Sequence, residues 1–256
     1  MSMSSPPILI SLSAFGADEV HRLGQRRFAE LAAEAGADGF EVRGELLNDP
    51  AAELPALASL AEARGLLRVF SSPEGLWRMD GTLDLPALER ALEHTALLGA
   101  PKLKMAIGGY AGPQELPLLA RRLAEMRVEL LIENDQTECA GTLPALQRFF
   151  ADTQAAGLRL PMTFDMGNWH WQGEDPLQAA QALAAGVGYV HCKGVQRLPA
   201  KWVAVPLAAS AAPWRTVLRT LPAGVPRAIE YPLQGEDLVG VTRAEVALLR
   251  RLETQR

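Results

Sequence analysis

Short apolar runs alternate with helical segments along the whole chain, and this alternation constrains the fold more than any other feature of the sequence. The first apolar run covers residues 8–13, the first helical segment covers residues 17–35, and the alternation ends with a helical segment at 242–252. Strands that alternate with helices of about a dozen residues predict parallel strands joined by crossover connections. Eight such units predict an α/β fold of the (β/α)8 TIM-barrel type.

The expected elements can be placed by residue number. The eight expected strands cover residues 8–13, 38–43, 66–71, 101–107, 130–133, 160–165, 187–192 and 226–230. The eight expected helices cover residues 17–35, 50–64, 85–98, 113–126, 142–156, 176–185, 213–221 and 242–252. No linker interrupts this rhythm, so we expect one domain over residues 1–256, with a loose N-terminus at residues 1–7. Two long strand-to-helix loops, 168–175 and 194–213, should lie on the face where such barrels carry active sites.

Composition narrows the class of protein. Hydrophobic residues make up 48% of the 256 residues and charged residues 21%, which is typical of a folded protein with a large core. The formal net charge of -5 argues against a nucleic-acid partner, because such partners require clustered basic surfaces. Cys139 and Cys192 lack CxxC spacing, which favours reduced thiols and a cytoplasmic protein. We recognise neither a secretory signal nor a run of the roughly 18 apolar residues that a membrane span needs, so no membrane partner is expected.

Four of the expected strands end in residues that can bind metal ions. Glu133, Asp165, His191 and Glu230 each stand at the end of an apolar run. Because the strands of such a barrel all point the same way, these four ends should meet at one rim. Three carboxylates and one imidazole suit a divalent ion such as Mn²⁺, Mg²⁺ or Co²⁺, with Zn²⁺ as an alternative. We therefore expect these four residues to hold one divalent metal ion.

A structural interpretation of the same residues is the alternative. Acidic side chains at strand ends can cap helices or form ion pairs, and Lys104, Lys193 and Arg197 are available as partners. Asp165 on its own would suit a helix N-cap. Capping explains the other three residues poorly, and ion pairing remains the alternative to a metal site.

The sequence around these residues resembles the xylose isomerase-like barrels, a group that includes sugar and sugar-phosphate isomerases, ketose 3-epimerases, dehydratases and endonuclease IV. The resemblance covers nearly the whole chain, and its carriers are residues 132–134, 164–168, 190–193 and 229–230. The strings IENDQT, TFDMGNW and ISLSAFGADEV further resemble an epimerase that is encoded with bacterial 2-ketogluconate catabolism. The resemblance implies a xylose isomerase-like TIM barrel that acts on a small carbohydrate.

The resemblance also implies roles for single residues. In the ketose epimerases, the residues that match the four proposed ligands bind one metal ion, and a residue that matches Arg197 contacts the metal site and the substrate. Asn168 stands where those epimerases usually have a histidine that touches substrate. Endonuclease IV needs more histidines for its three-zinc cluster than the four of this chain, so a DNA-repair role is not expected.

The leading hypothesis is isomerisation or epimerisation of a keto sugar or sugar acid, with or without a phosphate. A bound ion would acidify the C–H bond beside the substrate carbonyl and stabilise an enediolate. One of Glu133 and Glu230 would remove the proton, and the other would return a proton from the opposite face. A metal-dependent dehydratase that shares the proton abstraction is one alternative, and a catalytically silent sugar-binding barrel is another.

Five more residues are candidates for substrate binding. Arg197 and Lys193 could hold a carboxylate or a phosphate, and Lys104 resembles Lys193. Asn168 can hydrogen-bond a hydroxyl group, and Trp169 could form a wall of the pocket. A salt bridge for the lysines and a packed loop anchor for the tryptophan remain the alternatives.

Two further expectations concern an ion pair within the chain and the oligomeric state. Glu41 and Arg43 lie two residues apart on the second expected strand, and we expect them to form an ion pair inside the barrel at the edge of the pocket. The family resemblance favours a homo-oligomer.

Overall fold

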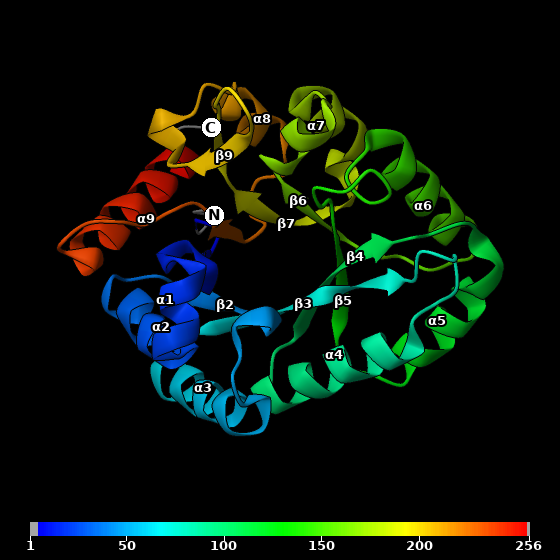
Figure 1. The fold of residues 1–256 in the computed structure, drawn as a ribbon, viewed down its shortest axis with the longest axis horizontal. Coiled ribbons are helices and arrows are strands. Elements are labelled where there is room, and N and C mark those ends of the chain that lie inside the picture. Colours follow the sequence, from blue (N-terminus) through cyan, green and yellow to red (C-terminus); the bar gives the residue numbers. More distant parts are fainter. Residues whose placement is uncertain (1–4, 255–256) are drawn as a thin grey trace.

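The computed structural model describes residues 5–254, which form a closed barrel of eight parallel strands inside a ring of helices (Figure 1). The strand order is β1-β10-β7-β6-β5-β4-β3-β2, and β1 closes the barrel by pairing with both β2 and β10. The predicted (β/α)8 barrel is therefore confirmed. The barrel strands are β1 (Ile8–Ser11), β2 (Gly39–Arg43), β3 (Leu67–Trp77), β4 (Lys102–Gly108), β5 (Glu129–Glu133), β6 (Met162–Asp165), β7 (Val187–Cys192) and β10 (Arg227–Ile229).

The outer ring consists of nine α-helices within the described residues. They are α1 (Ala17–Leu23), α2 (Gln25–Glu34), α3 (Pro50–Arg64), α4 (Leu85–Leu98), α5 (Leu116–Ala124), α6 (Leu143–Ala155), α7 (Pro176–Leu183), α8 (Trp214–Thr220) and α9 (Leu238–Thr254). The bounds of α3 and α4 agree with the prediction because both ends carry strong local signals. Asp49 and Asp84 cap the two N-termini, and Gly65 and Gly99 follow the C-termini in the left-handed conformation.

Four elements differ from the prediction. The third strand, β3, continues to Trp77 rather than ending at residue 71. The single helix expected at 17–35 is two helices, because Gly24 adopts a positive φ of 81° between them. The long loop after β7 contains an antiparallel hairpin of β8 (Gly194–Arg197) and β9 (Trp202–Val205), whose valines favour extended backbone. The last helix begins at Leu238 rather than at Thr242.

The described part of the N-terminus is not loose. Residues 1–4 of the predicted loose segment lie outside the described residues, but the carbonyl oxygen of Pro7 accepts a hydrogen bond of 2.9 Å from the amide of Arg227. Pro6 is buried. The segment directly before β1 is therefore docked against β10. Within residues 5–254, the helices are all too short or too polar to cross a membrane.

The interior of the barrel changes from apolar to polar along its axis. Leu9, Val69, Leu131, Tyr189 and Ala228 form a small buried cluster that is separate from the larger core between barrel and helices. Since side chains two residues apart on a strand share a face, the next interior layer is read two residues later. That layer contains Ser11, Ser71, Glu133, His191 and Glu230, all polar. An apolar floor therefore lies beneath a polar layer at the carboxyl ends of the strands.

Candidate metal centre

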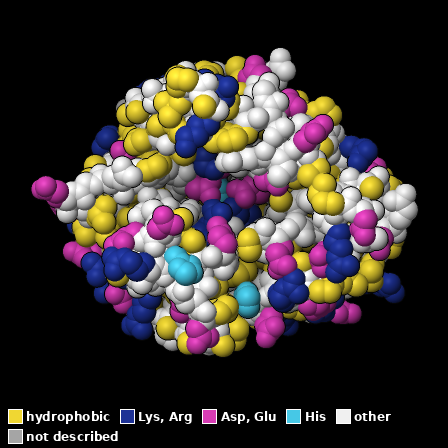
Figure 2. Space-filling view, viewed as in Figure 1, with side chains coloured by type: hydrophobic (Ala, Val, Ile, Leu, Met, Phe, Trp, Pro, Cys, Tyr) yellow, Lys and Arg dark blue, Asp and Glu magenta, His cyan; other side chains and the backbone are white. Residues whose placement is uncertain are grey.

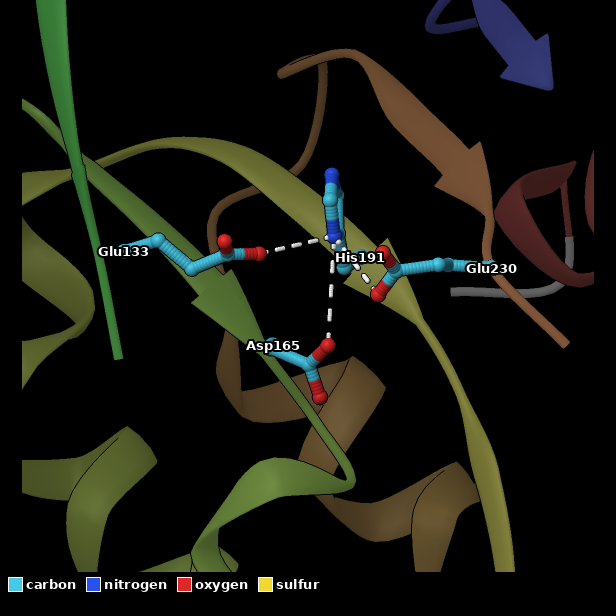
Figure 3. Close-up of side chains that lie close together, drawn as sticks. All are labelled: Glu133, Asp165, His191 and Glu230. Carbon is cyan, nitrogen blue, oxygen red and sulfur yellow. Dashed lines mark hydrogen bonds and ion pairs between the residues drawn. The ribbon is translucent and has the colours of Figure 1, made fainter. Parts of the chain in front are cut away.

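Four side chains converge above the apolar floor, at the carboxyl ends of neighbouring strands. Glu133 ends β5, Asp165 ends β6, His191 lies in β7, and Glu230 directly follows β10. One ligand atom from each lies within 4.8 Å of the others. The Nδ1 atom of His191 is 2.9 Å from Glu133 Oε1, 2.9 Å from Glu230 Oε2 and 3.8 Å from Asp165 Oδ2. Figure 3 shows the three carboxylates pointing toward this nitrogen from different sides. The structure thus brings the four predicted ligands together.

The backbone after β6 fixes the orientation of the Asp165 carboxylate. Its Oδ1 atom accepts hydrogen bonds from the amides of Gly167 and Asn168, at 2.7 and 2.8 Å. Its Oδ2 atom forms an ion pair with the Lys193 ammonium at 2.8 Å and lies 3.8 Å from His191 Nδ1. Oδ2 is therefore the oxygen that faces the centre of the cluster.

The other three ligands are each held by a charged partner as well. His191 Nε2 lies 2.7 Å from Glu41 Oε2, and Glu133 Oε2 lies 2.7 Å from the Lys104 ammonium. Glu230 Oε1 accepts a hydrogen bond from the Arg43 guanidinium. In each case the second atom of the same group faces the centre of the cluster, where His191 Nδ1 contacts Glu133 Oε1 and Glu230 Oε2.

This donor set fits a divalent cation. Three carboxylate oxygens and one imidazole nitrogen are ligands that Mg²⁺, Mn²⁺, Co²⁺ and Zn²⁺ accept. The separation of 2.9 Å between His191 Nδ1 and two of the oxygens equals the spacing of adjacent ligands around an ion with bonds of about 2.1 Å. The buried Oδ2 atom of Asp165 already pairs with one cation, the Lys193 ammonium at 2.8 Å, which shows that this position favours positive charge.

The local charges set the protonation of the carboxylates. Burial alone would raise the pKa of Glu133, but the nearby Lys104 ammonium and His191 outweigh it and lower this pKa to about 2. Burial likewise opposes ionisation of Glu230, but Lys193 and His191 hold its pKa well below the usual value. Burial raises the pKa of Asp165 to about 6, although Lys193 opposes the shift. Glu133 and Glu230 are therefore carboxylates at neutral pH, the form that binds cations and accepts protons.

A cavity of about 260 Å³ opens beside the cluster. Arg43, Lys193 and Glu230 supply its charged lining, and its remaining lining residues are Ser13, Ala14, Ala204, Tyr231 and Pro232. Figure 2 shows acidic and basic side chains gathered in the hollow at the centre of this face. Its volume is below the range of about 300–1,000 Å³ of pockets for drug-sized ligands, so it suits a small polar molecule.

Lys193 is held at the edge of this cavity by three oxygens. Its ammonium lies 2.8 Å from Asp165 Oδ2, 2.8 Å from Glu230 Oε2 and 3.0 Å from Asn168 Oδ1. Its stem crosses Gly167, where an added Cβ would come within 2.9 Å of the Lys193 Cγ and Cδ atoms. The glycine after β6 therefore makes room for the lysine to reach the cluster.

The other predicted substrate contacts do not line this cavity. Lys104 is 1% exposed and lies beneath the ligands, and Trp169 is fully buried with its ring 5.4 Å from that of Phe164. Asn168 is buried and contacts Lys193. Arg197 is exposed on the β8–β9 hairpin, where its guanidinium lies 5.4 Å from the centre of the Trp202 ring.

Glu41 and Arg43 have different partners from those expected. Glu41 contacts His191 and Lys104, whereas Arg43 binds Glu230 and also contacts Glu45 at 2.8 Å. The expected pair between Glu41 and Arg43 is thus replaced by contacts across the barrel. The period of two along β2 places both side chains in the interior, but it does not reveal which distant strands they reach.

Comparisons with known proteins address the fold. No family model matches the chain, and no curated protein matches its sequence. Among solved structures, a xylose isomerase-like TIM barrel/4-hydroxyphenylpyruvate dioxygenase fusion protein has a TM-score of 0.71 at 13% identity. That match covers 95% of this chain and 42% of the fusion protein, so the chain spans less than half of that protein.

Two further structures match over almost their whole length. The probable 3-DHS dehydratase AsbF from Bacillus anthracis, involved in petrobactin synthesis, has a TM-score of 0.68 at 14% identity, with 95% of this chain and 98% of that chain covered. A D-allulose 3-epimerase from Methylomonas sp. has a TM-score of 0.68 at 15% identity, with 98% and 99% covered. At these identities the comparisons establish the fold, which is that of the xylose isomerase-like TIM barrels.

Proposed function

We propose that the protein is a divalent-metal-dependent isomerase or epimerase of a keto sugar or keto sugar acid. The observation that carries this proposal is the convergence of three carboxylates and one imidazole beside a small polar cavity at the carboxyl ends of the strands. This is the face on which barrels of this kind carry their active sites. The fold similarity to a D-allulose 3-epimerase supports the same class of reaction.

In this proposal Glu133, Asp165, His191 and Glu230 hold the ion. A divalent ion supplies Lewis-acid chemistry, which acidifies a C–H bond beside a carbonyl group. Mn²⁺, Mg²⁺ and Co²⁺ are the preferred candidates for this mostly oxygen donor set, and Zn²⁺ is the alternative.

The two glutamates form the acid–base pair in this proposal. In Figure 3, Glu133 and Glu230 reach the centre of the cluster from opposite sides of the His191 ring. A substrate carbon between them would present one face to each carboxylate. One glutamate would remove the proton beside the carbonyl, and the other, after taking a proton from solvent, would return it to the opposite face, which inverts that carbon.

A dehydratase is the second candidate function. It would share the proton abstraction and then expel a hydroxyl group from the next carbon. The Lys193 ammonium, 2.8 Å from Glu230 Oε2 at the edge of the cavity, could give the departing hydroxyl its proton. The fold similarity to the probable 3-DHS dehydratase AsbF supports this candidate.

Solvent deuterium incorporation tests the proposed function directly. The protein would be incubated in D₂O with Mn²⁺ and a panel of keto sugars and keto sugar acids, and the products would be followed by NMR after removal of the ion. We expect deuterium beside the carbonyl group only when the ion is present during incubation. An epimerised product would support the first candidate, a conjugated enone the second, and no exchange on any substrate would contradict both.

The cations that line the cavity favour a substrate with an anionic group. Lys193 and Arg43 both face the cavity, whereas Arg197 lies outside it on the exposed hairpin. A hydrogen bond to a charged group contributes about 1.5–3 kcal/mol, which is roughly tenfold or more in affinity. Lys193→Met should therefore lower kcat/KM for a keto sugar acid about tenfold more than for the matching neutral sugar. Arg197→Met is the matched control, and a larger effect there would assign the anion contact to the hairpin instead.

A further inference from the structure

The proposed chemistry gives no role to Glu41, one of the two fully buried acids of the site. Glu41 lies on β2, across the barrel interior from His191, and its side chain has no exposed surface. Glutamate is almost never fully buried unless it is paired, so its contacts should explain its presence.

Glu41 belongs to a closed ring of four ionisable groups. Its Oε2 atom is 2.7 Å from His191 Nε2, and its Oε1 atom is 3.2 Å from the Lys104 ammonium. Lys104 is in turn 2.7 Å from Glu133 Oε2, and Glu133 Oε1 is 2.9 Å from His191 Nδ1. Glu41 on β2 and Lys104 on β4 are not proposed ligands. They thus link two proposed ligands, His191 and Glu133.

The ring rests directly on the apolar floor of the barrel. The Tyr189 ring packs edge-on against the His191 ring, with centres 5.2 Å apart, and Leu9, Val69 and Leu131 belong to the same buried cluster. Charges in such surroundings interact strongly and have few alternative partners. The contacts within the ring therefore determine how its members are oriented.

Both imidazole nitrogens of His191 face carboxylates, since Nε2 contacts Glu41 and Nδ1 contacts Glu133 and Glu230. With a cation held at Nδ1, the contact with Glu41 is the one that keeps a proton. A carboxylate at Nε2 favours the tautomer with a proton on that nitrogen, and the lone pair then lies on Nδ1. Nδ1 is the nitrogen that faces the carboxylates of Glu133 and Glu230. With Glu133 Oε2 held by Lys104, Oε1 is the glutamate oxygen that is left for the same centre.

We propose that Glu41 and Lys104 are positioning residues for the metal centre. Glu41 selects Nδ1 of His191 as the ligand atom. Lys104 joins Glu41 to Glu133, so that the ligands His191 and Glu133 are presented together. Stability alone does not require this arrangement, because well-packed apolar residues of similar volume are often as stabilising as a buried ion pair. The inference rests on the proposed metal site and assigns Lys104 to positioning rather than to substrate contact.

Two variants of Glu41 separate its acceptor role from its charge. Glu41→Gln removes the charge but keeps an oxygen that can accept the Nε2 proton, whereas Glu41→Met removes both. Loss of such an outer partner typically lowers metal affinity about 10–100-fold. We expect Mn²⁺ affinity, measured by calorimetry, to fall in both variants and to be about tenfold lower in Glu41→Met than in Glu41→Gln. Glu45→Gln is the matched control, because it removes a nearby carboxylate that contacts Arg43 and should change the affinity little.

The tautomer of His191 provides a readout that needs no variant. With ¹⁵N-labelled protein loaded with diamagnetic Mg²⁺ or Zn²⁺, the imidazole of His191 can be distinguished among only four histidines. We expect a proton on Nε2 and none on Nδ1. The opposite tautomer would overturn the inference even if Glu41→Met fails to fold. Equal Mn²⁺ affinity in Glu41→Met and Glu45→Gln, with only thermal stability reduced, would also overturn it while leaving the proposed function intact. A wild-type protein that binds no divalent ion would remove the basis of both the proposed function and this inference.

Discussion

Replacing Glu133 by glutamine should lower metal-dependent deuterium exchange at least a hundredfold while the barrel stays folded. Glu133 is both a proposed metal ligand and one of the two proposed acid–base groups, so the change removes two functions at once. Loss of general acid–base catalysis alone typically costs about 10²–10⁴-fold in rate. Glutamine keeps the size of the side chain and can still pair with Lys104 through its amide oxygen, so the packing beneath the site is retained.

The same strand supplies the control for this variant. Glu129 lies at the opposite end of β5, where it is exposed and pairs with Lys102 away from the cluster. Glu129→Gln removes an equal charge from the same strand and should leave exchange unchanged within about twofold, since exposed ion pairs contribute little. Circular dichroism and thermal unfolding of both variants would show that the fold is retained. Full exchange by a metal-free preparation of Glu133→Gln would contradict the proposed mechanism.

The convergence of the four proposed ligands was predictable from sequence because the relevant physics is local. An apolar run that ends in a carboxylate or an imidazole can be recognised in the sequence, and parallel strands place all such ends at one rim. Glu133, Asp165 and His191 each follow or end such a run, so their convergence needed only the number and direction of the strands. The N-termini of α3 and α4 could be predicted for the same reason, because Asp49 and Asp84 accept hydrogen bonds from backbone amides three residues later.

The contacts across the barrel were not predictable in this way. Glu41 on β2 reaches His191 on β7, and these strands are not neighbours in the sheet. Such a contact depends on the register of every intervening strand pair and on the width of the barrel, neither of which the period of a single strand encodes. Arg197 illustrates the same limit, because six residues beyond His191 the chain has already entered the β8–β9 hairpin. The place of Arg197 outside the lining of the cavity therefore does not follow from its sequence distance to His191.

Addition of a divalent ion should stabilise the protein by an amount that depends on its concentration. A ligand that binds only the folded state at 100 times its Kd contributes about 2.7 kcal/mol. For a chain of this size that corresponds to an increase in Tm of about 5–10 °C. Differential scanning calorimetry with increasing Mn²⁺, Mg²⁺, Co²⁺ and Zn²⁺ would measure the shift, and the ion with the largest shift at equal concentration identifies the preferred metal.

Asp165→Asn tests whether this stabilisation arises at the proposed centre. The asparagine oxygen can still accept the backbone hydrogen bonds from Gly167 and Asn168, but the group that faces the cluster loses its charge. The Tm of this variant should therefore respond to the ion by less than half of the wild-type shift, and Glu129→Gln should respond as the wild type does. An equal shift in all three proteins would place the bound ion elsewhere on the surface. A shift lost only in Asp165→Asn would link the bound ion to the cluster on which both the proposed acid–base chemistry and the positioning role of Glu41 depend.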